Sequence, residues 1–140
     1  YRPAQLNLTG LTSKRADLMS LPFENNSVAS ISCMHVVEHI GLGRYGDPLD
    51  PKGDLKAISE LKRVTAISGD LLFVVPMGSQ SIIQYNAHRI YTYKQILDYF
   101  SEFKLMNFAY VNDAGAYIAN ATEIDTTNQM YGCGCFHFRK

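Results

Sequence analysis

The sequence predicts an α/β domain in which helices cover a mostly parallel β-sheet. Runs of β-forming residues alternate along the chain with segments of helical periodicity, an order that favours parallel strands joined by crossover helices. Residues 71–75 are all apolar and precede Pro76, as is typical of a strand buried on both faces of such a sheet. Ligands of these sheets bind beyond the carboxyl ends of the strands. We therefore expect a site in the polar segments after Met34 and Val75.

The first half of the chain predicts a strand, a helix and a second strand. Residues 28–34 follow an Asn-Asn-Ser turn signal, and we expect a short strand there. Residues 54–66 carry apolar side chains at helical spacing, with Asp54 as the expected N-cap and Gly69 as the expected stop. The apolar run at 71–75 then forms the second strand.

The second half predicts a helix followed by two strands. Thr92 and Gln95 match a capping box, and apolar residues follow them at helical spacing. Residues 105–111 and 133–139 favour strands, which we expect to pair as an antiparallel hairpin at the sheet edge. No repeat or low-complexity tract interrupts the chain, so residues 1–140 are predicted to form a single domain.

Composition narrows the class of protein. The 140 residues can bury about 68–70 % of their unfolded surface, and 46 % hydrophobic with 19 % charged residues fits a globular protein. Thirteen basic and thirteen acidic residues leave no positive excess, so neither nucleic acid nor an acidic membrane is an expected partner. No apolar run approaches the roughly 20 residues of a membrane span. Three cysteines without framework spacing favour a reducing compartment, and we expect a cytoplasmic protein.

A glycine pattern follows the first strand. Gly41, Gly43 and Gly46 match the spacing of a dinucleotide-binding fingerprint, which requires a helix to open directly out of the last glycine. Here the turn-rich Asp-Pro-Leu-Asp-Pro of residues 47–51 follows instead. We interpret the glycines as a tight loop over a site, which presents three polar side chains: Arg44, Tyr45 and Asp47.

His35, Glu38 and His39 permit three interpretations. On a helix, the two histidines at i and i+4 would share a face and hold zinc for hydrolysis, although no third ligand is evident. A histidine beside a carboxylate also suits general acid–base catalysis. The third interpretation is a structural turn held by internal hydrogen bonds. We favour the first role least, and treat His35 and Glu38 as the candidate catalytic residues.

Two further pairs of residues each permit two interpretations. Cys133 and Cys135 offer only two metal ligands within an expected strand, so packed free thiols are the preferred interpretation. Arg44 and Arg89 suit a carboxylate or phosphate on a substrate. Alternatively, these arginines pair with the nearby aspartates and hold the loops, namely Asp47, Asp50 and Asp54.

Several segments, in order, resemble S-adenosylmethionine-dependent methyltransferases of the seven-stranded Rossmann-like fold. These are Ala-Asp-Leu at 16–18, Leu-Pro-Phe at 21–23, Ser-Val at 27–28, His-Val-Val-Glu-His at 35–39 and Glu-Leu-Lys-Arg-Val at 60–64, then Gly69, Pro76, His88 and Tyr-Thr-Tyr at 91–93. Residues 38–54 and 84–91 more closely resemble the signature of the domain of unknown function 268 family.

This resemblance implies a Rossmann-like fold, S-adenosylmethionine as cofactor and methyl transfer to a small oxygen- or nitrogen-containing acceptor. It places Asp17 and Leu18 at the adenine, with Cys33, Met34 and His35 forming the floor of the cofactor site. The acceptor would face the remaining polar residues of the two loops: Arg44, Tyr45, Asp47, Asn86, His88 and Arg89. The alternative is a non-catalytic binding or scaffold domain of the same fold.

The resemblance also implies a glycine-rich turn and an acidic ribose-binding residue before Asp17. Neither occurs in residues 1–16, so we expect a domain that lacks its first strand or strands. A parallel sheet without its first strand has an exposed edge, and such an edge invites pairing with a second copy of the chain. A homodimer is therefore an expected assembly.

Overall fold

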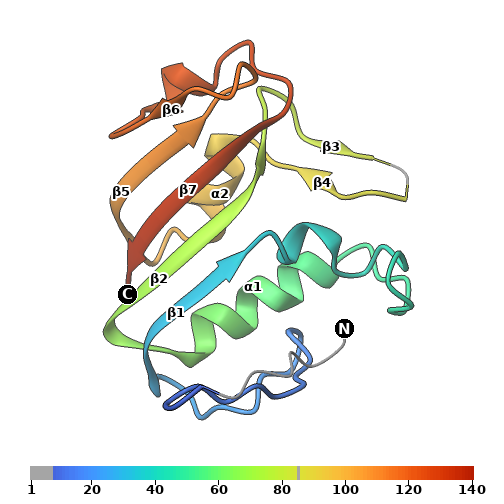
Figure 1. Ribbon diagram of the computed structural model, residues 1–140, viewed down its shortest axis with the longest axis vertical. Helices are drawn as coiled ribbons and strands as arrows, with labels where there is room; N and C mark the ends of the chain where they lie inside the picture. The colour runs from blue at the N-terminus through green and yellow to red at the C-terminus, as the bar shows by residue number, and fades with distance from the viewer. Residues whose placement is uncertain (1–7, 85) are drawn as a thin grey trace.

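A five-stranded sheet forms the centre of the computed structural model, which describes residues 8–84 and 86–140 (Figure 1). The strand order is β1-β2-β7-β5-β6. Their bounds are β1 Val28–Met34, β2 Thr65–Met77, β5 Lys104–Val111, β6 Tyr117–Ile118 and β7 Gly132–Arg139. Two further short strands, β3 (Ile82–Ile83) and β4 (Arg89–Ile90), form a separate antiparallel ribbon.

Strand β7 runs against its neighbours. β1 and β2 pair in parallel, whereas β7 is antiparallel to both β2 and β5. β5 therefore runs in the same direction as β1 and β2. The predicted α/β class is confirmed, as is the antiparallel pairing of the last two long strands. The predicted hairpin at the sheet edge was wrong. β7 pairs directly with β5 but lies inside the sheet, and along the chain β6 and η2 (Glu123–Thr126) come between the two strands.

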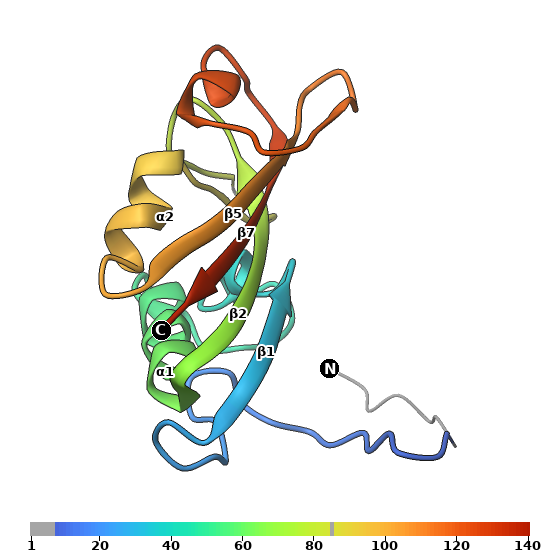
Figure 2. The same cartoon turned by 90° about the vertical axis from the view of Figure 1, so that its left-hand side faces the viewer.

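The helices α1 (Gly53–Val64) and α2 (Tyr93–Tyr99) lie on the same side of the sheet (Figure 2). The expected capping box before α2 is present, since Thr92 accepts from the Gln95 N–H and the Gln95 side chain accepts from the Thr92 N–H. On the helix side of the sheet, aromatic rings from strands and α2 fill the core. Phe100 stacks on Phe138 with ring centroids 4.8 Å apart, and Phe108 packs on Phe136 at 4.6 Å.

Both predicted boundaries of α1 differ from the structure. The N-cap is Lys52, and Asp54 lies inside the first turn, where its buried carboxylate contacts other elements instead of the helix end. At the other end, β2 begins directly at Thr65, without a glycine stop. Gly69 lies within β2, and a Cβ there would come within 3.0 Å of two backbone oxygens. Gly69 therefore lets backbone segments approach each other so closely that a side chain would not fit.

The three cysteines divide between the two faces of the sheet. Cys33 belongs to the buried core, whereas Cys133 and Cys135 are only partly buried. Along β7 the buried residues alternate with exposed or half-buried ones, so both thiols lie on the face opposite Phe136 and Phe138. Both are free thiols, as predicted, but they are only partly packed, because alternation along the strand turns them away from the helices. No helix in the described ranges is long and apolar enough to cross a membrane.

Candidate functional site

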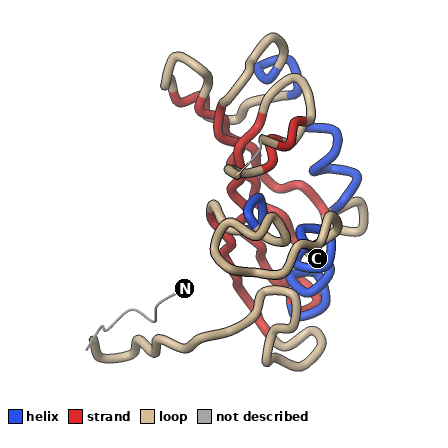
Figure 3. Tube along the Cα trace, turned by 90° about the vertical axis from the view of Figure 1, so that its right-hand side faces the viewer, coloured by secondary structure: helices blue, strands red, loops and turns tan. Residues whose placement is uncertain are grey.

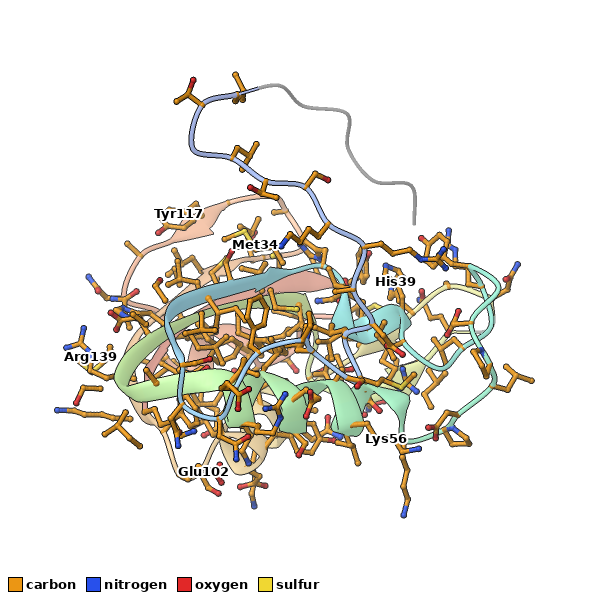
Figure 4. The ribbon with its side chains drawn as sticks, turned by 90° about the horizontal axis from the view of Figure 1, so that it is seen from below. Met34, His39, Lys56, Glu102, Tyr117 and Arg139 are labelled. Atoms are coloured by element: carbon orange, nitrogen blue, oxygen red, sulfur yellow. The ribbon has the colours of Figure 1, made fainter. Side chains whose placement is uncertain are left out.

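The carboxyl end of β1 leads directly into the predicted site, which is built from loops and the short helix η1 (Val37–His39; Figure 3). Met34 ends the strand with its side chain pointing away from α1 (Figure 4). His35 follows with a φ of 53°, a left-handed conformation that breaks the strand. His35 lies outside η1, so it shares no helix face with His39. The pair of histidines on one helix face that would hold zinc is therefore not formed. Across residues 8–84 and 86–140, no group of three His, Cys, Asp or Glu side chains is arranged to hold a metal ion.

Glu38 and His35 form the contact that the sequence predicts. The Glu38 side chain is 1 % exposed, and its Oε1 lies 3.1 Å from His35 Nδ1. The same oxygen is 3.9 Å from His39 Nε2, while Oε2 has no hydrogen-bond partner among the described residues. A carboxylate that accepts from Nδ1–H leaves Nε2 of that histidine as the basic nitrogen. The His35 side chain is 51 % exposed, and its Nε2 lies 3.5 Å from Cys133 Sγ.

The Asp47 carboxylate holds together the loop that contains Gly41, Gly43 and Gly46, which we call the glycine loop. Its carboxylate accepts hydrogen bonds from the backbone N–H groups of Gly41, Gly43 and Tyr45, at 2.7, 3.4 and 3.3 Å. Although desolvation opposes them, these backbone donors lower the pKa of Asp47 below its ordinary value. Gly41, Gly43 and Gly46 all have positive φ, as a tight loop requires. The Asp47 carboxylate therefore holds the glycine loop together from inside and occupies these backbone donors.

A series of ring contacts connects the glycine loop with η1, the segment before β4 and the segment before β7. Arg44 lies over the Tyr45 ring at 5.5 Å, and Tyr45 meets His39 edge-on at 5.4 Å. His39 contacts His88 at 5.8 Å, and His88 stacks on Tyr131 at 5.3 Å. Burial, together with the nearby positive charges of His39 and Arg44, lowers the pKa of His88. Tyr131 was missed by the sequence analysis, because nothing in its local pattern places it beside residue 88.

Arg89 occupies a different position from Arg44. It is 5 % exposed, and its Nε lies 3.4 Å from Asp54 Oδ2. Its guanidinium also donates to the carbonyl oxygens of Ile40 at 2.7 Å and Pro51 at 3.3 Å. The pairing with an aspartate that the sequence left open is therefore present, and it holds the ends of the glycine loop. Arg44 is exposed and donates to the Ala87 carbonyl.

Two cavities collect most of the remaining predicted residues. One, of about 450 Å³, has Asp17 and Leu18 on one wall and Cys33 and Met34 on the other. Its other walls are mainly apolar: Ala16, Leu21, Ile31, Ser32, Val36, Ile40 and Leu61. A second cavity, of about 560 Å³, lies beneath the glycine loop and includes Asp47 and Asn86. His35 lines neither of them, but it stands directly after Met34.

The chain has the Rossmann-like α/β fold found in methyltransferase-like proteins. Within that class, the chain is a member of the family described as Caenorhabditis protein of unknown function, DUF268, whose sequence model matches residues 21–131. No curated protein matches the chain at a significant level.

Solved structures of this fold cover nearly all of the chain. The [4+2]-cyclase SpnF matches with a TM-score of 0.62 and 15 % identity, over 91 % of this chain and 56 % of the cyclase. An S-adenosylmethionine-dependent methyltransferase from Methanosarcina mazei matches at 0.58 and 15 %, over 91 % and 66 %. Geranyl diphosphate C-methyltransferase from Streptomyces coelicolor A3(2) matches at 0.57 and 10 %, over 90 % and 52 %. The chain thus spans about half to two thirds of the length of these proteins.

Proposed function

We propose that the protein binds S-adenosylmethionine and transfers its methyl group to a small acceptor with an oxygen or nitrogen nucleophile. The observation that carries this proposal is the cavity of about 450 Å³ at the carboxyl end of β1. In open α/β sheets, this end is where ligands bind. Largely apolar walls with one well-placed polar group are typical of a small-molecule site.

The residues of this cavity fit the adenosine end of the cofactor. Adenine has two flat apolar faces and an exocyclic amine that donates hydrogen bonds. Leu18 and Ile40 offer apolar contacts for the faces, and the Asp17 carboxylate offers an acceptor for the amine. Asp17 already accepts from the Met19 N–H at 2.9 Å, which fixes its orientation. Such preorganisation reduces the entropy that binding costs.

The acceptor would approach from the side of His35 and the glycine loop. When bound, S-adenosylmethionine supplies a methyl group already activated by a positively charged sulfur. The chain then has to orient the acceptor and take up its proton. Glu38 fixes the His35 ring, and His35 Nε2 is the candidate base for a hydroxyl or amine. The exposed guanidinium of Arg44 suits an acidic group on the acceptor.

A non-catalytic or differently reacting domain is the second candidate. The structural neighbours include a [4+2]-cyclase as well as methyltransferases, and a fold alone never determines the reaction. A scaffold that has lost the cofactor site binds no S-adenosylmethionine, whereas a domain with a different reaction is distinguished by an assay of methyl transfer to an acceptor.

Calorimetry of the full protein with S-adenosylmethionine and S-adenosylhomocysteine tests the proposal. We expect measurable binding, and Asp17→Asn is expected to weaken it by about 10- to 100-fold, the effect of losing one charge-assisted hydrogen bond. Glu24→Gln, at an exposed carboxylate that does not line the cavity, is the matched control and leaves the affinity unchanged. His35→Ala is expected to weaken binding or, once an acceptor is known, activity. Absence of binding by the full protein would exclude the proposal.

A further inference from the structure

Tyr131 lies at the edge of the sheet where ligands of this fold bind. Because β7 is antiparallel to β2, it begins at the end of the sheet where β2 finishes, and Gly132 pairs with Met77 there (Figure 1). Tyr131 is the residue directly before this first residue of β7. Open α/β sheets bind their ligands beyond the carboxyl ends of the parallel strands. Tyr131 therefore enters the same region as His35, although the two residues are far apart in the sequence.

The backbone of Tyr131 is fixed by the segments that follow β5 and β2. Asp113, shortly after the end of β5, accepts hydrogen bonds from the N–H groups of Met130 and Tyr131, at 2.7 and 2.9 Å. The adjacent Gln129 carbonyl accepts from the N–H of Ser79, shortly after the end of β2, at 2.8 Å. The position of Tyr131 is therefore set before a ligand arrives, which reduces the entropy that binding costs.

The Tyr131 ring is covered on one face and open on the other. It stacks on His88 with ring centroids 5.3 Å apart and an angle of 28° between the ring planes, yet Tyr131 is 53 % exposed. Burial, together with the nearby charges of His39 and Arg44, lowers the pKa of His88, so the imidazole behind the tyrosine is neutral at pH 7. We call Tyr131 and His88 the aromatic shelf. Its exposed face can take a second ring.

The aromatic shelf lies beside the candidate base. Cys133 is two positions after Tyr131, and its Sγ lies 3.5 Å from His35 Nε2. Two steps along the chain span at most about 7 Å. A single substituted ring can bridge a separation of this size, so a ring lying on the shelf brings its substituent towards His35.

The imidazole of the shelf reaches the same base by a second route, through η1. His88 contacts His39 with ring centroids 5.8 Å apart. His39 Nε2 and His35 Nδ1 in turn face the same oxygen of Glu38, at 3.9 and 3.1 Å. Both members of the shelf are therefore connected to His35, one along the chain and the other through side-chain contacts.

We propose that the aromatic shelf binds a flat ring of the methyl acceptor, so that the acceptor is an aromatic compound whose hydroxyl or amine points towards His35. This inference rests on the proposed function and names its substrate class. Offset-stacked rings attract each other beyond the effect of the apolar area that they bury, and a fixed flat surface favours a flat ligand over a puckered one. Tyr131 is therefore a specificity-determining residue, which contacts the ring of the acceptor.

Two probes that differ in the flatness of their ring test this inference. 4-Hydroxybenzoate and trans-4-hydroxycyclohexanecarboxylate each carry one hydroxyl and one carboxylate, but only the first has a flat ring. Ligand-observed NMR titration of the full protein, with and without S-adenosylhomocysteine, gives the Kd of each probe. We expect the flat probe to bind about 3- to 10-fold more tightly, the effect of one ring stack. Tyr131→Ala should bring the ratio of the two Kd values to about one, whereas Tyr131→Phe should preserve it.

Tyr117→Ala is the matched control, because Tyr117 is 67 % exposed but belongs to β6, the outer strand of the sheet. It should leave the ratio unchanged. Should Tyr131→Ala fail to fold, Tyr131→Leu replaces it, since leucine keeps apolar bulk without a flat ring. If S-adenosylhomocysteine does not bind but the ratio and its loss in Tyr131→Ala persist, methyl transfer is contradicted and the ring-binding role of the shelf is supported. Equal Kd values for the two probes, no binding of either probe, or equal effects of the two tyrosine-to-alanine variants would overturn the inference.

Discussion

At the scale of single residues, a buried ion pair holds the site's loops in place. Asp54 and Arg89 are each 5 % exposed, and the Tyr91 hydroxyl donates to Asp54 Oδ2 at 3.1 Å. The pair connects the first turn of α1 with β4, while Arg89 also donates to the two ends of the glycine loop. In such a pair, neither charge can lose its partner without leaving the other buried and uncompensated.

Arg89→Met is therefore expected to lower the free energy of unfolding by about 3–5 kcal/mol. Arg44→Met is the control, because this arginine is exposed and its loss should change stability by no more than about 0.5 kcal/mol. Urea unfolding followed by circular dichroism measures both variants. Similar stability losses in the two variants would show that the buried pair has no special role.

The residue scale also shows what local spacing can predict. His35 and Glu38 are three positions apart, and the sequence predicts their contact because a short turn brings such residues together. Cys133 gives no such signal, since its contact with His35 depends on how distant strands are ordered. Arg44 and Arg89 occur in similar polar loops, and only the structure separates an exposed arginine from a buried one.

At the scale of elements, α1 fixes the segment that forms one wall of the 450 Å³ cavity. Glu60 Oε2 accepts from the Leu21 N–H at 2.7 Å, and Arg63 donates to the Leu21 carbonyl at 3.0 Å. Arg63 and Glu60 also bond to each other at 2.7 Å. The hydrogen bond from Arg63 is the main reason why the pKa of Glu60 falls from 4.5 to about 2.

This lowered pKa predicts a pH dependence of stability. Because the folded pKa lies below the ordinary one, the contribution of Glu60 is complete above pH 4.5 and is lost as the pH falls towards 2. Glu60→Gln should be less stable than the wild type at pH 7, and the difference should shrink between pH 4.5 and 2. Glu102→Gln, at an exposed ion pair with Lys62, should show little difference at any pH. A gap that stays constant on acidification would contradict the assignment.

Element type was more predictable than element boundaries. The capping box of α2 is a local signal and is present as expected. The start and end of α1 were misplaced because Asp54 and Gly69 are residue types with two uses. An aspartate suits both an N-cap and a buried ion pair, and a glycine suits both a helix stop and a close backbone approach. Tertiary contacts decide between these uses.

At the scale of the whole molecule, β7 joins the two halves of the sheet. It pairs with β2 on one side and with β5 on the other. Its inward face contributes Phe136, which packs against Phe108 and lies parallel to Phe138 at 5.5 Å. The order of strands could not be read from the sequence, because the pattern of β7 suits an edge strand as well as an internal one.

Phe136→Ala is expected to cost about 3–5 kcal/mol and to weaken both halves of the sheet together. His137→Ala, on the outward face of the same strand, loses an exposed pair with Asp70 and should cost less than about 1 kcal/mol. Differential scanning calorimetry should show one transition, shifted to lower temperature, for Phe136→Ala. Two separate transitions would mean that β7 does not couple the halves.

The internal position of the last strand also sets a time order for assembly. During synthesis, β2 and β5 emerge well before the residues that lie between them, so the sheet stays divided until the end of the described chain has left the ribosome. Cys133, the β7 residue that contacts His35, emerges at the same late stage. Nascent chains that stop short of residue 132 therefore carry the carboxylate and the imidazole without this sulfur, and the rim of the site is completed only with the final strand.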